Sequence, residues 1–231
     1  MFPFNRKAVY GCALGLLGSL PAGADDLSAA RTPNWTGSFV ARVEALALLQ
    51  TLNAALLSNS SATLTLEHWC EDHRLASPPR IVAERVPDVD KAPSPEQRRE
   101  LGVTPAEPVR YRRVRLLCGP VVLSEADNWY VPARLTPEMN RLLDTTDTPF
   151  GRAVQSLQFK RRTLSATALW HPLPEGWEMG ASANVGAAAL PMPPKLLEHR
   201  AILSLPDGTP FSEVVETYSA NVLAFPVPPP P

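Results

Sequence analysis

YRRVRLLCGPVVLSEADNWYVPARLTPEMNRLLDTTDTPFG, residues 111–151, is the stretch that decides the fold of this chain. Its first part predicts a strand, and its second part, which ends at Pro132, predicts the antiparallel partner of that strand. Two Thr-Pro pairs then follow, Thr136-Pro137 and Thr148-Pro149. Each pair predicts the start of a short helix, because proline is favoured at the first helical position behind a threonine cap.

The segments on either side complete an α+β domain. Apolar residues recur at helical spacing in 38–57, and Asn59-Ser60-Ser61 separates this helix from a second one at 62–72. Further predicted elements are a strand at 81–86, a helical turn at 95–100, a strand at 159–170, a long loop at 171–194, and a hairpin of 197–205 with 211–221. This order predicts one antiparallel sheet of five or six strands with helices packed on one side.

The two ends of the chain lie outside this domain, which we place at 38–225. Residues 1–24 read as a signal peptide, because Arg6 and Lys7 precede a short apolar run and small residues precede a cut after Ala24. Residues 25–37 are predicted to be a linker, and the proline-rich residues 226–231 a tail. We therefore expect a periplasmic or secreted protein.

Charge and cysteine content narrow the class of partner. The formal net charge of −1 becomes −3 once Arg6 and Lys7 are removed, because residues 1–24 contain no acid, and such a charge gives no reason to expect nucleic-acid binding. After the signal peptide no apolar run is long enough to predict a membrane span. As a separate expectation, the protein is a monomer. Two cysteines remain, Cys70 and Cys118, and they form either a disulfide or two buried thiols.

A metal centre is not expected. His68, Cys70, Glu71, Asp72 and His73 crowd together at the end of the predicted helix. The two histidines are five residues apart, so they point to different sides of a helix and cannot share one ion. No other cofactor is indicated by the sequence.

The central stretch resembles the chorismate lyase family, whose members split chorismate into pyruvate and a hydroxybenzoate and share a fold with UTRA-like ligand-binding domains. The similarity lies in Arg113-Val114-Arg115-Leu116-Leu117-Cys118, then Val131-Pro132, then Thr148-Pro149-Phe150-Gly151-Arg152. The family also has a Ser-x-Thr segment, matched by Ser61-Ala62-Thr63, and a Gly-x-Pro turn before a Thr-Glu strand, matched by Gly208-Thr209-Pro210 and Glu216-Thr217. The resemblance implies a chorismate lyase-like fold and a small aromatic carboxylate as ligand.

By this resemblance Arg113 is the carboxylate clamp, and Glu216 is the catalytic acid or base or the group that binds the ligand hydroxyl. The backbone of Phe150 and Gly151 would donate hydrogen bonds to the ligand. Arg115 replaces an aliphatic residue of the family, and it either adds a second clamp or indicates that this face is wetter than the family's pocket. Ala62 stands where family members place a methionine over the ligand, which implies a roomier or leakier pocket. Glu216 lies one residue further from the turn than in the family, so either Glu216 or Glu213 faces the pocket.

A plainer interpretation stands beside this one, because a row of arginines on a strand is commonly solvated or ion-paired. Three functions therefore remain open. The protein is a chorismate pyruvate-lyase, a non-catalytic exported binder of a small aromatic or carboxylate metabolite that uses the same pocket, or an envelope interaction protein.

Overall fold

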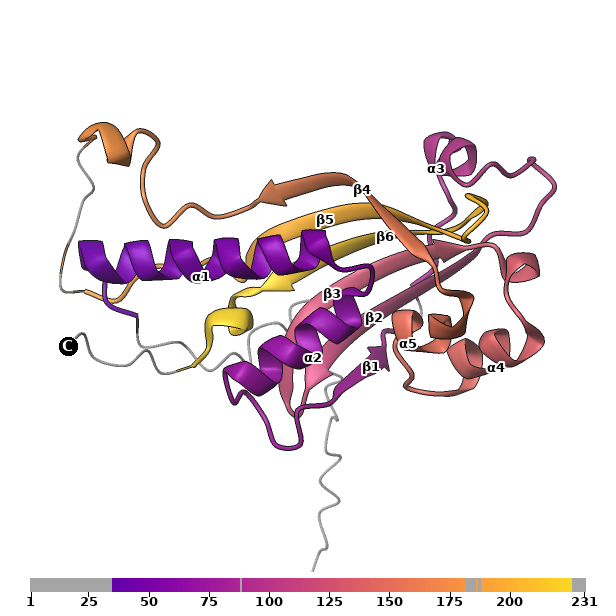
Figure 1. Ribbon diagram of the computed structural model, residues 1–231, viewed down its shortest axis with the longest axis horizontal. Helices are drawn as coiled ribbons and strands as arrows, with labels where there is room; N and C mark the ends of the chain where they lie inside the picture. The colour runs from indigo at the N-terminus through magenta and orange to yellow at the C-terminus, as the bar shows by residue number, and fades with distance from the viewer. Residues whose placement is uncertain (1–34, 88, 182–185, 187, 226–231) are drawn as a thin grey trace, which may run out of the picture.

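The computed structural model describes residues 35–87, 89–181, 186 and 188–225. Its centre is one antiparallel sheet of six strands in the order β1-β2-β3-β6-β5-β4 (Figure 1). The strands are β1 (Ile81–Arg85), β2 (Arg110–Cys118), β3 (Val121–Tyr130), β4 (Lys160–Ala168), β5 (Lys195–Ser204) and β6 (Pro210–Ser219). The predicted α+β class with a single antiparallel sheet is confirmed.

Helices cover one face of this sheet. They are α1 (Phe39–Ser58), α2 (Ala62–Asp72), α4 (Pro137–Thr145) and α5 (Phe150–Ala153), with α4 and α5 at the end opposite the start of α1 (Figure 1). The short helix α3 (Pro95–Glu100) instead contacts the other face, where Gln97 donates a hydrogen bond to Glu213 of β6. Short 3-10 turns lie at 132–134, 155–157, 177–179 and 220–223.

The local sequence explains where the helices begin. Ser38, Ser61 and Thr136 each accept a hydrogen bond from a backbone N–H in the first turn of α1, α2 and α4 respectively. The second Thr-Pro pair differs from the prediction, because Pro149 is the residue that precedes α5 rather than its first helical residue. An extended Pro149 fits this place, since the residue before a helix needs no helical backbone angles.

Helix α1 packs on the sheet through one stripe. Ala45, Leu49, Leu52 and Leu56 are buried there together with the apolar side of α2. By length and composition α1 is nevertheless apolar enough to cross a membrane, although the sequence pattern predicts no span, and 28% of its most apolar window is buried. The core helix of a protein passes the same test, and α1 buries one stripe of its surface against the sheet and α2.

Two contacts join segments that are far apart in the sequence. Trp35, within the predicted linker, is buried, and its indole N–H donates to the carbonyl of Leu223 in the turn at 220–223. The predicted signal peptide, residues 25–34 of the predicted linker, and the predicted tail lie outside the described residues. Of the two alternatives for the cysteines, the structure has the disulfide between Cys70 of α2 and Cys118 at the end of β2.

Candidate ligand-binding cavity

A cavity lies between the helix-covered face of the sheet and the first residues of α2 and α5. Its free volume is about 40 Å³. The lining residues from the helical side are Ser60, Ser61, Ala62, Thr63, Phe150 and Gly151, and those from the sheet side include Arg112, Val114, Leu116, Ala126, Asn128, Phe159, Arg161, Leu203, Val214 and Glu216. Three charged side chains thus meet an otherwise apolar and weakly polar wall.

The first charged feature of the cavity is an ion pair between two distant strands. Arg161 of β4 donates to Glu216 of β6 at 2.6 Å, and the side chains are only 4% and 8% exposed. The Tyr218 hydroxyl also donates to Glu216, at 3.1 Å. Burial disfavours the charged guanidinium, but the nearby carboxylate outweighs it, so the pKa of Arg161 is raised. Burial likewise raises the pKa of Tyr218 well above its ordinary value.

The second charged feature is Arg112 of β2, which is 5% exposed. Its guanidinium donates to the carbonyl of Thr148 at 3.1 Å, and its Nε finds no acceptor among the described residues. No carboxylate of the described chain lies within ion-pair distance of it. Burial and, to a smaller extent, the charge of Arg85 together lower the pKa of Arg112 to about 10, although the carboxylate of Asp144 acts in the opposite direction. Arg112 is therefore a charged group at neutral pH that makes no ion pair with a carboxylate of the described residues.

The helix ends that face these charges are held close together. A Cβ on Gly151 would lie 2.9 Å from the Ser61 hydroxyl, so only glycine allows the start of α5 to approach the start of α2 this closely. Arg152 of α5 donates to both carboxylate oxygens of Glu67 of α2, at 2.8 and 2.6 Å. The beginning of α2 carries unpaired backbone N–H groups and the positive end of the helix dipole, both of which favour an anion in the cavity.

Arg113 and Arg115 do not line this cavity, which corrects the expectation drawn from the family resemblance. Side chains alternate along β2, and both arginines lie on the face that Arg112 does not use. Arg113 is 28% exposed and pairs with Glu125 at 3.0 Å, and Arg115 contacts Glu84 and Glu125 at 3.4 Å. The ion-paired interpretation therefore describes these two arginines, and Arg113 does not face Glu216.

The open choice between Glu216 and Glu213 is decided by the register of β6. Glu216 pairs with Ala126 of β3 and points into the cavity, whereas Glu213 pairs with Trp129 and points to the other face. There Glu213 is fully buried and accepts from Arg200 at 2.7 Å. Of the other predicted residues, Ala62, Phe150 and Gly151 line the cavity; their role as binding residues stays a prediction.

Sequence reasoning missed Arg112 and Arg161. For Arg112 a signal was available, because Arg112, Val114, Leu116 and Cys118 alternate as one mostly apolar face, on which an arginine is conspicuous. For Arg161 no comparable signal exists. It lies in the run Lys160-Arg161-Arg162 on an edge strand, and nothing local distinguishes it from its exposed neighbours.

The charges of the cavity do not balance. Arg112 and Arg161 contribute two positive charges and Glu216 contributes one negative charge, so a net charge of about +1 is enclosed at neutral pH. A buried guanidinium is a bidentate donor for a carboxylate. The arrangement can therefore hold a small organic anion.

Comparisons with known proteins place the chain in a family. It is 56% identical over 227 residues to the uncharacterized protein y4mC of Sinorhizobium fredii, covering 97% of this chain and 95% of that protein. No family model matches. Among solved structures, the effector domain of PhnF from Mycobacterium smegmatis has 14% identity and a TM-score of 0.46 over 70% of this chain and 90% of that domain.

YydK of Bacillus subtilis, described as a possible transcriptional regulator, has 18% identity and a TM-score of 0.38; the match covers 64% of this chain and 62% of YydK. Both structural similarities are remote, whereas the similarity to y4mC extends over nearly the whole of both chains. The chain thus belongs to the same protein family as y4mC of Sinorhizobium fredii.

Proposed function

We propose that this protein binds a small carboxylate-bearing metabolite in the cavity between α2, α5 and the sheet. The observation that carries the proposal is Arg112, a buried guanidinium with no carboxylate partner among the described residues. A buried, uncompensated charge is costly to a folded protein unless an opposite charge joins it. A ligand carboxylate at Arg112 would supply that charge.

The surrounding groups select the kind of anion. Arg161 and Glu216 form a closed pair, so their charges largely cancel and Arg112 is left as the anchor. Val114, Leu116 and Val214 provide an apolar wall beside this anchor. A carboxylate with a small apolar body fits such a lining better than a strongly hydrated inorganic anion, because the apolar wall gives no hydrogen bonds to replace water.

The size of the cavity sets a further condition. A free volume of about 40 Å³ holds a few water molecules or a carboxylate group, but not an aromatic ring. A bulky ligand therefore requires side chains such as Phe150 or Phe159 to move. Both rings pack against Phe211, and Phe150 also contacts Tyr130, so such a movement has to break these contacts.

Calorimetric titration of the purified protein with benzoate, 4-hydroxybenzoate and pyruvate tests the proposal. The wild type is expected to bind at least one of these acids but not benzamide, which has the shape of benzoate without its charge. Arg112→Met is expected to abolish binding. Arg113→Met is the matched control, because it removes the neighbouring guanidinium from the opposite face of the same strand and is expected to bind as the wild type does.

A lyase acting on chorismate is the second candidate, and one observation favours it. The Arg161–Glu216 pair, with the Tyr218 hydroxyl on the same carboxylate, provides a buried guanidinium and a carboxyl group from distant strands. With Arg112 as the anchor of a ligand carboxylate, Glu216 of this pair can accept or donate a proton at a hydroxyl of the ligand. Pyruvate release from chorismate can be measured with a coupled dehydrogenase. Release by the wild type that is lost in Glu216→Gln would support the lyase. If the wild type released no pyruvate, only the non-catalytic binding function would remain.

We also propose that the protein is exported and acts outside the cytoplasm. The Cys70–Cys118 disulfide supports this, because disulfides persist in oxidising compartments and are rare in the cytosol. N-terminal sequencing of the protein recovered from its native cells tests the cleavage after Ala24. An intact residue 1 in the mature protein would contradict the proposal.

A further inference from the structure

The two edges of the sheet differ in how their backbone groups are satisfied. In β1, at one edge, the Ile81 N–H donates to the Glu67 side chain at 3.0 Å. The Ala83 N–H of the same strand donates to the carbonyl of Asp147 at 2.8 Å. In β4, at the other edge, no hydrogen bond of the described residues reaches the backbone of 163–168 apart from the pairing with β5. A strand with an unpaired edge is a template for a further strand.

The residues along the outer edge of β4 favour such pairing. Residues 163–169 read TLSATAL and contain none of the charges or prolines by which proteins usually block an exposed edge. The Leu169 N–H donates to the carbonyl of Leu196 in β5. By alternation along the strand, the N–H groups of Ala166 and Ala168 therefore point away from β5.

An arm, residues 171–181, follows β4 and extends beyond the sheet on the side of this edge (Figure 1). Helix α1 holds the arm at two points. Arg42 donates to the carbonyl of Pro172 at 2.7 Å, and the ring of Phe39 lies 5.9 Å from the ring of Trp177. The arm is therefore a fixed projection next to the unpaired edge.

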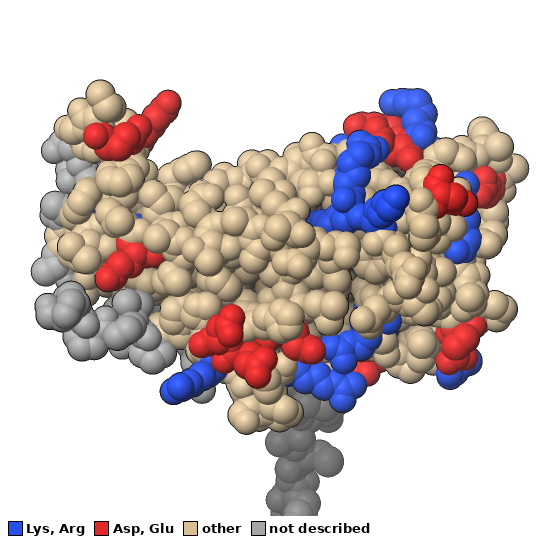
Figure 2. All heavy atoms as spheres, viewed as in Figure 1, with Lys and Arg blue, Asp and Glu red and all other residues tan. Residues whose placement is uncertain are grey.

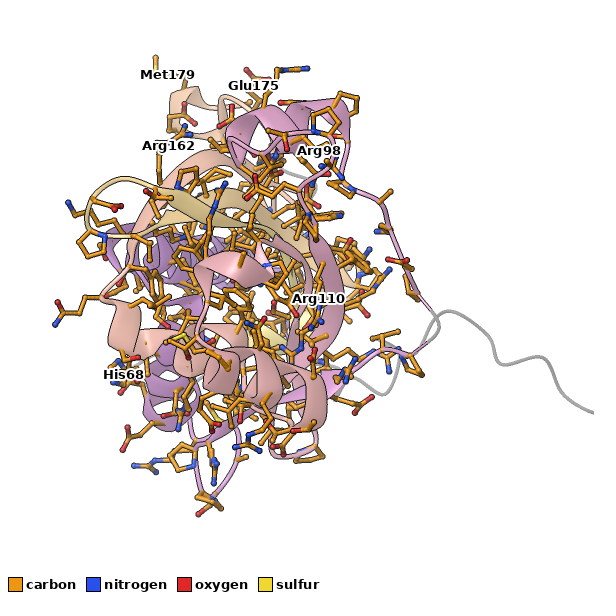
Figure 3. All side chains as sticks on the ribbon, turned by 90° about the vertical axis from the view of Figure 1, so that its right-hand side faces the viewer. His68, Arg98, Arg110, Arg162, Glu175 and Met179 are labelled. Carbon is orange, nitrogen blue, oxygen red and sulfur yellow. A yellow bond between two sulfur atoms is a disulfide. The ribbon has the colours of Figure 1, made fainter. Side chains whose placement is uncertain are left out.

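The arm is acidic, and the start of β4 is basic. Glu175 and Glu178 are exposed, and the arm contains no Lys or Arg. Lys160 and Arg162 are exposed at the start of β4. Within the described chain the two glutamates and Lys160 belong to no ion pair, and Arg162 pairs only with Glu100 while its side chain stays 63% exposed. Figure 3 shows Glu175 and Arg162 at the same edge of the molecule.

We propose that β4 pairs antiparallel with β4 of a second copy of this chain, about a twofold axis at Ala166. In this register Thr163 of one copy lies opposite Leu169 of the other, so the uncharged stretch pairs with itself. The acidic arm of each copy then meets the basic start of β4 in the other copy. The two Lys160 side chains are about 40 Å apart, because twelve residues of extended chain separate them, so like charges do not meet.

The order of charges along this edge favours a second copy over another partner. An acidic end, an uncharged middle and a basic end are complementary to themselves when the strand is turned by a twofold axis. A strand of nine residues is about 30 Å long and a sheet about 10 Å thick, so the strand edge offers roughly 300 Å² per copy. An arm of similar length roughly doubles this area, which reaches the lower limit of about 1,200 Å² for a stable interface of two copies.

This inference goes beyond the proposed function and does not depend on it. It differs from the sequence-based expectation of a monomer. Sedimentation velocity of the purified protein over a range of concentrations tests it, and the wild type is expected to form a reversible dimer.

Ala166→Lys puts two like charges opposite one another at the twofold axis and is expected to raise the dissociation constant at least about tenfold. Ala54→Lys is the matched control, because Ala54 is equally exposed but lies on the side of α1 that faces away from the sheet. This control is expected to form dimers as the wild type does.

Charge reversal identifies the contact between the arm and the strand. Glu175→Lys with Glu178→Lys, and separately Lys160→Glu with Arg162→Glu, place like charges at both contacts, and each double variant alone is expected to form dimers about a hundredfold more weakly. An equimolar mixture of the two double variants should recover the dimer, because every arm then meets an opposite charge. A merely structural role of these residues gives no recovery on mixing.

Two results would overturn the second copy as the partner of this edge. One is a wild type that stays monomeric at its highest soluble concentration, including one that pairs with a different protein instead. The other is a dimer that Ala166→Lys and both double variants leave unchanged. Ligand titration of Ala166→Lys is expected to match the wild type, so failure of the dimer and failure of the proposed function are measured separately.

Discussion

Replacing Arg112 by methionine should make the ligand-free protein more stable while it abolishes binding. The side chain is buried, its single hydrogen bond goes to the Thr148 carbonyl, and no described carboxylate compensates its charge. Methionine keeps the length of the aliphatic part and removes the charge. The cost of burying the guanidinium then disappears, and the cost of leaving the Thr148 carbonyl without its donor appears in its place.

The expected change in the free energy of unfolding follows from the lowered pKa of Arg112. Burial lowers the pKa of Arg112 to about 10, and at 1.36 kcal/mol for each pKa unit this places the cost of the buried charge at about 3 kcal/mol. The lost hydrogen bond to Thr148 costs about 1 kcal/mol. The net gain is about 2 kcal/mol in the free energy of unfolding, or roughly 4–8 °C in Tm for a chain of this size.

The pH dependence gives an independent check. The pKa of Arg112 is lower in the folded state than in the unfolded state, so the unfolded state binds more protons above about pH 10 and the wild type gains relative stability there. Between about pH 6 and pH 9 both states are fully charged, and the difference between Arg112→Met and wild type should stay constant. It should shrink as the pH rises through about 10.

Urea unfolding of both proteins, followed by circular dichroism at pH 7, measures the difference, and Arg113→Met again serves as control. The outer-face ion pairs of Arg113 are partly exposed, so that variant should change stability by less than about 1 kcal/mol. If Arg112→Met were less stable than wild type by more than about 1 kcal/mol, Arg112 would be a structural residue and the reasoning for an anion site would be refuted.

Four further outcomes follow from the same contacts. Glu216→Gln leaves Arg161 buried without its partner and should lower the free energy of unfolding by about 3–5 kcal/mol. The double replacement of Arg161 by Met and Glu216 by Leu should recover most of this loss, and urea titration measures both changes. Reduction of Cys70–Cys118 should lower the free energy of unfolding by about 4 kcal/mol, because the bridge closes a loop of 48 residues; unchanged unfolding with reductant would contradict this. Gly151→Ala should cost about 1–3 kcal/mol, since its Cβ would meet the Ser61 hydroxyl at 2.9 Å, and Ser61→Ala in the same chain should relieve part of the loss. Burial lowers the pKa of His199, so stability should fall as the pH drops below about 6.5, and His199→Gln should remove that slope in unfolding curves measured at pH 5 to 8.

Charged side chains are unevenly spread over the face shown in Figure 2. Lys and Arg lie mostly toward the end that carries α3, α4 and α5, with Asp and Glu among them, and the middle of the face, over α1, is almost without charge. Exposed ion pairs such as Arg162 with Glu100 contribute to this mixture of signs.

The sequence predicted the fold well because its signals are local. Helical spacing of apolar residues, caps such as Ser61, and the turn at 206–210 each depend on a few adjacent residues. Those signals gave α2 with its observed bounds, Ala62–Asp72, and β1, β2, β3, β5 and β6 within a few residues. The family resemblance assigned Ala62 and Gly151 to one binding site; both line the cavity, and their role in binding stays a prediction.

Prediction of the site residues depended on which face of the strand each side chain occupies and on which residues of distant strands meet. The family resemblance chose Arg113, but strand alternation makes Arg112 the inward side chain, and an assignment that is off by one residue reverses the face of the sheet. No sequence rule pairs Arg161 with Glu216, which are 55 residues apart, because their contact arises only when β4, β5 and β6 align. The chain by itself determined which elements form and what chemistry they carry; the tertiary structure alone decided which charges are buried together, because burial and the loss of solvation belong to the assembled sheet and helices.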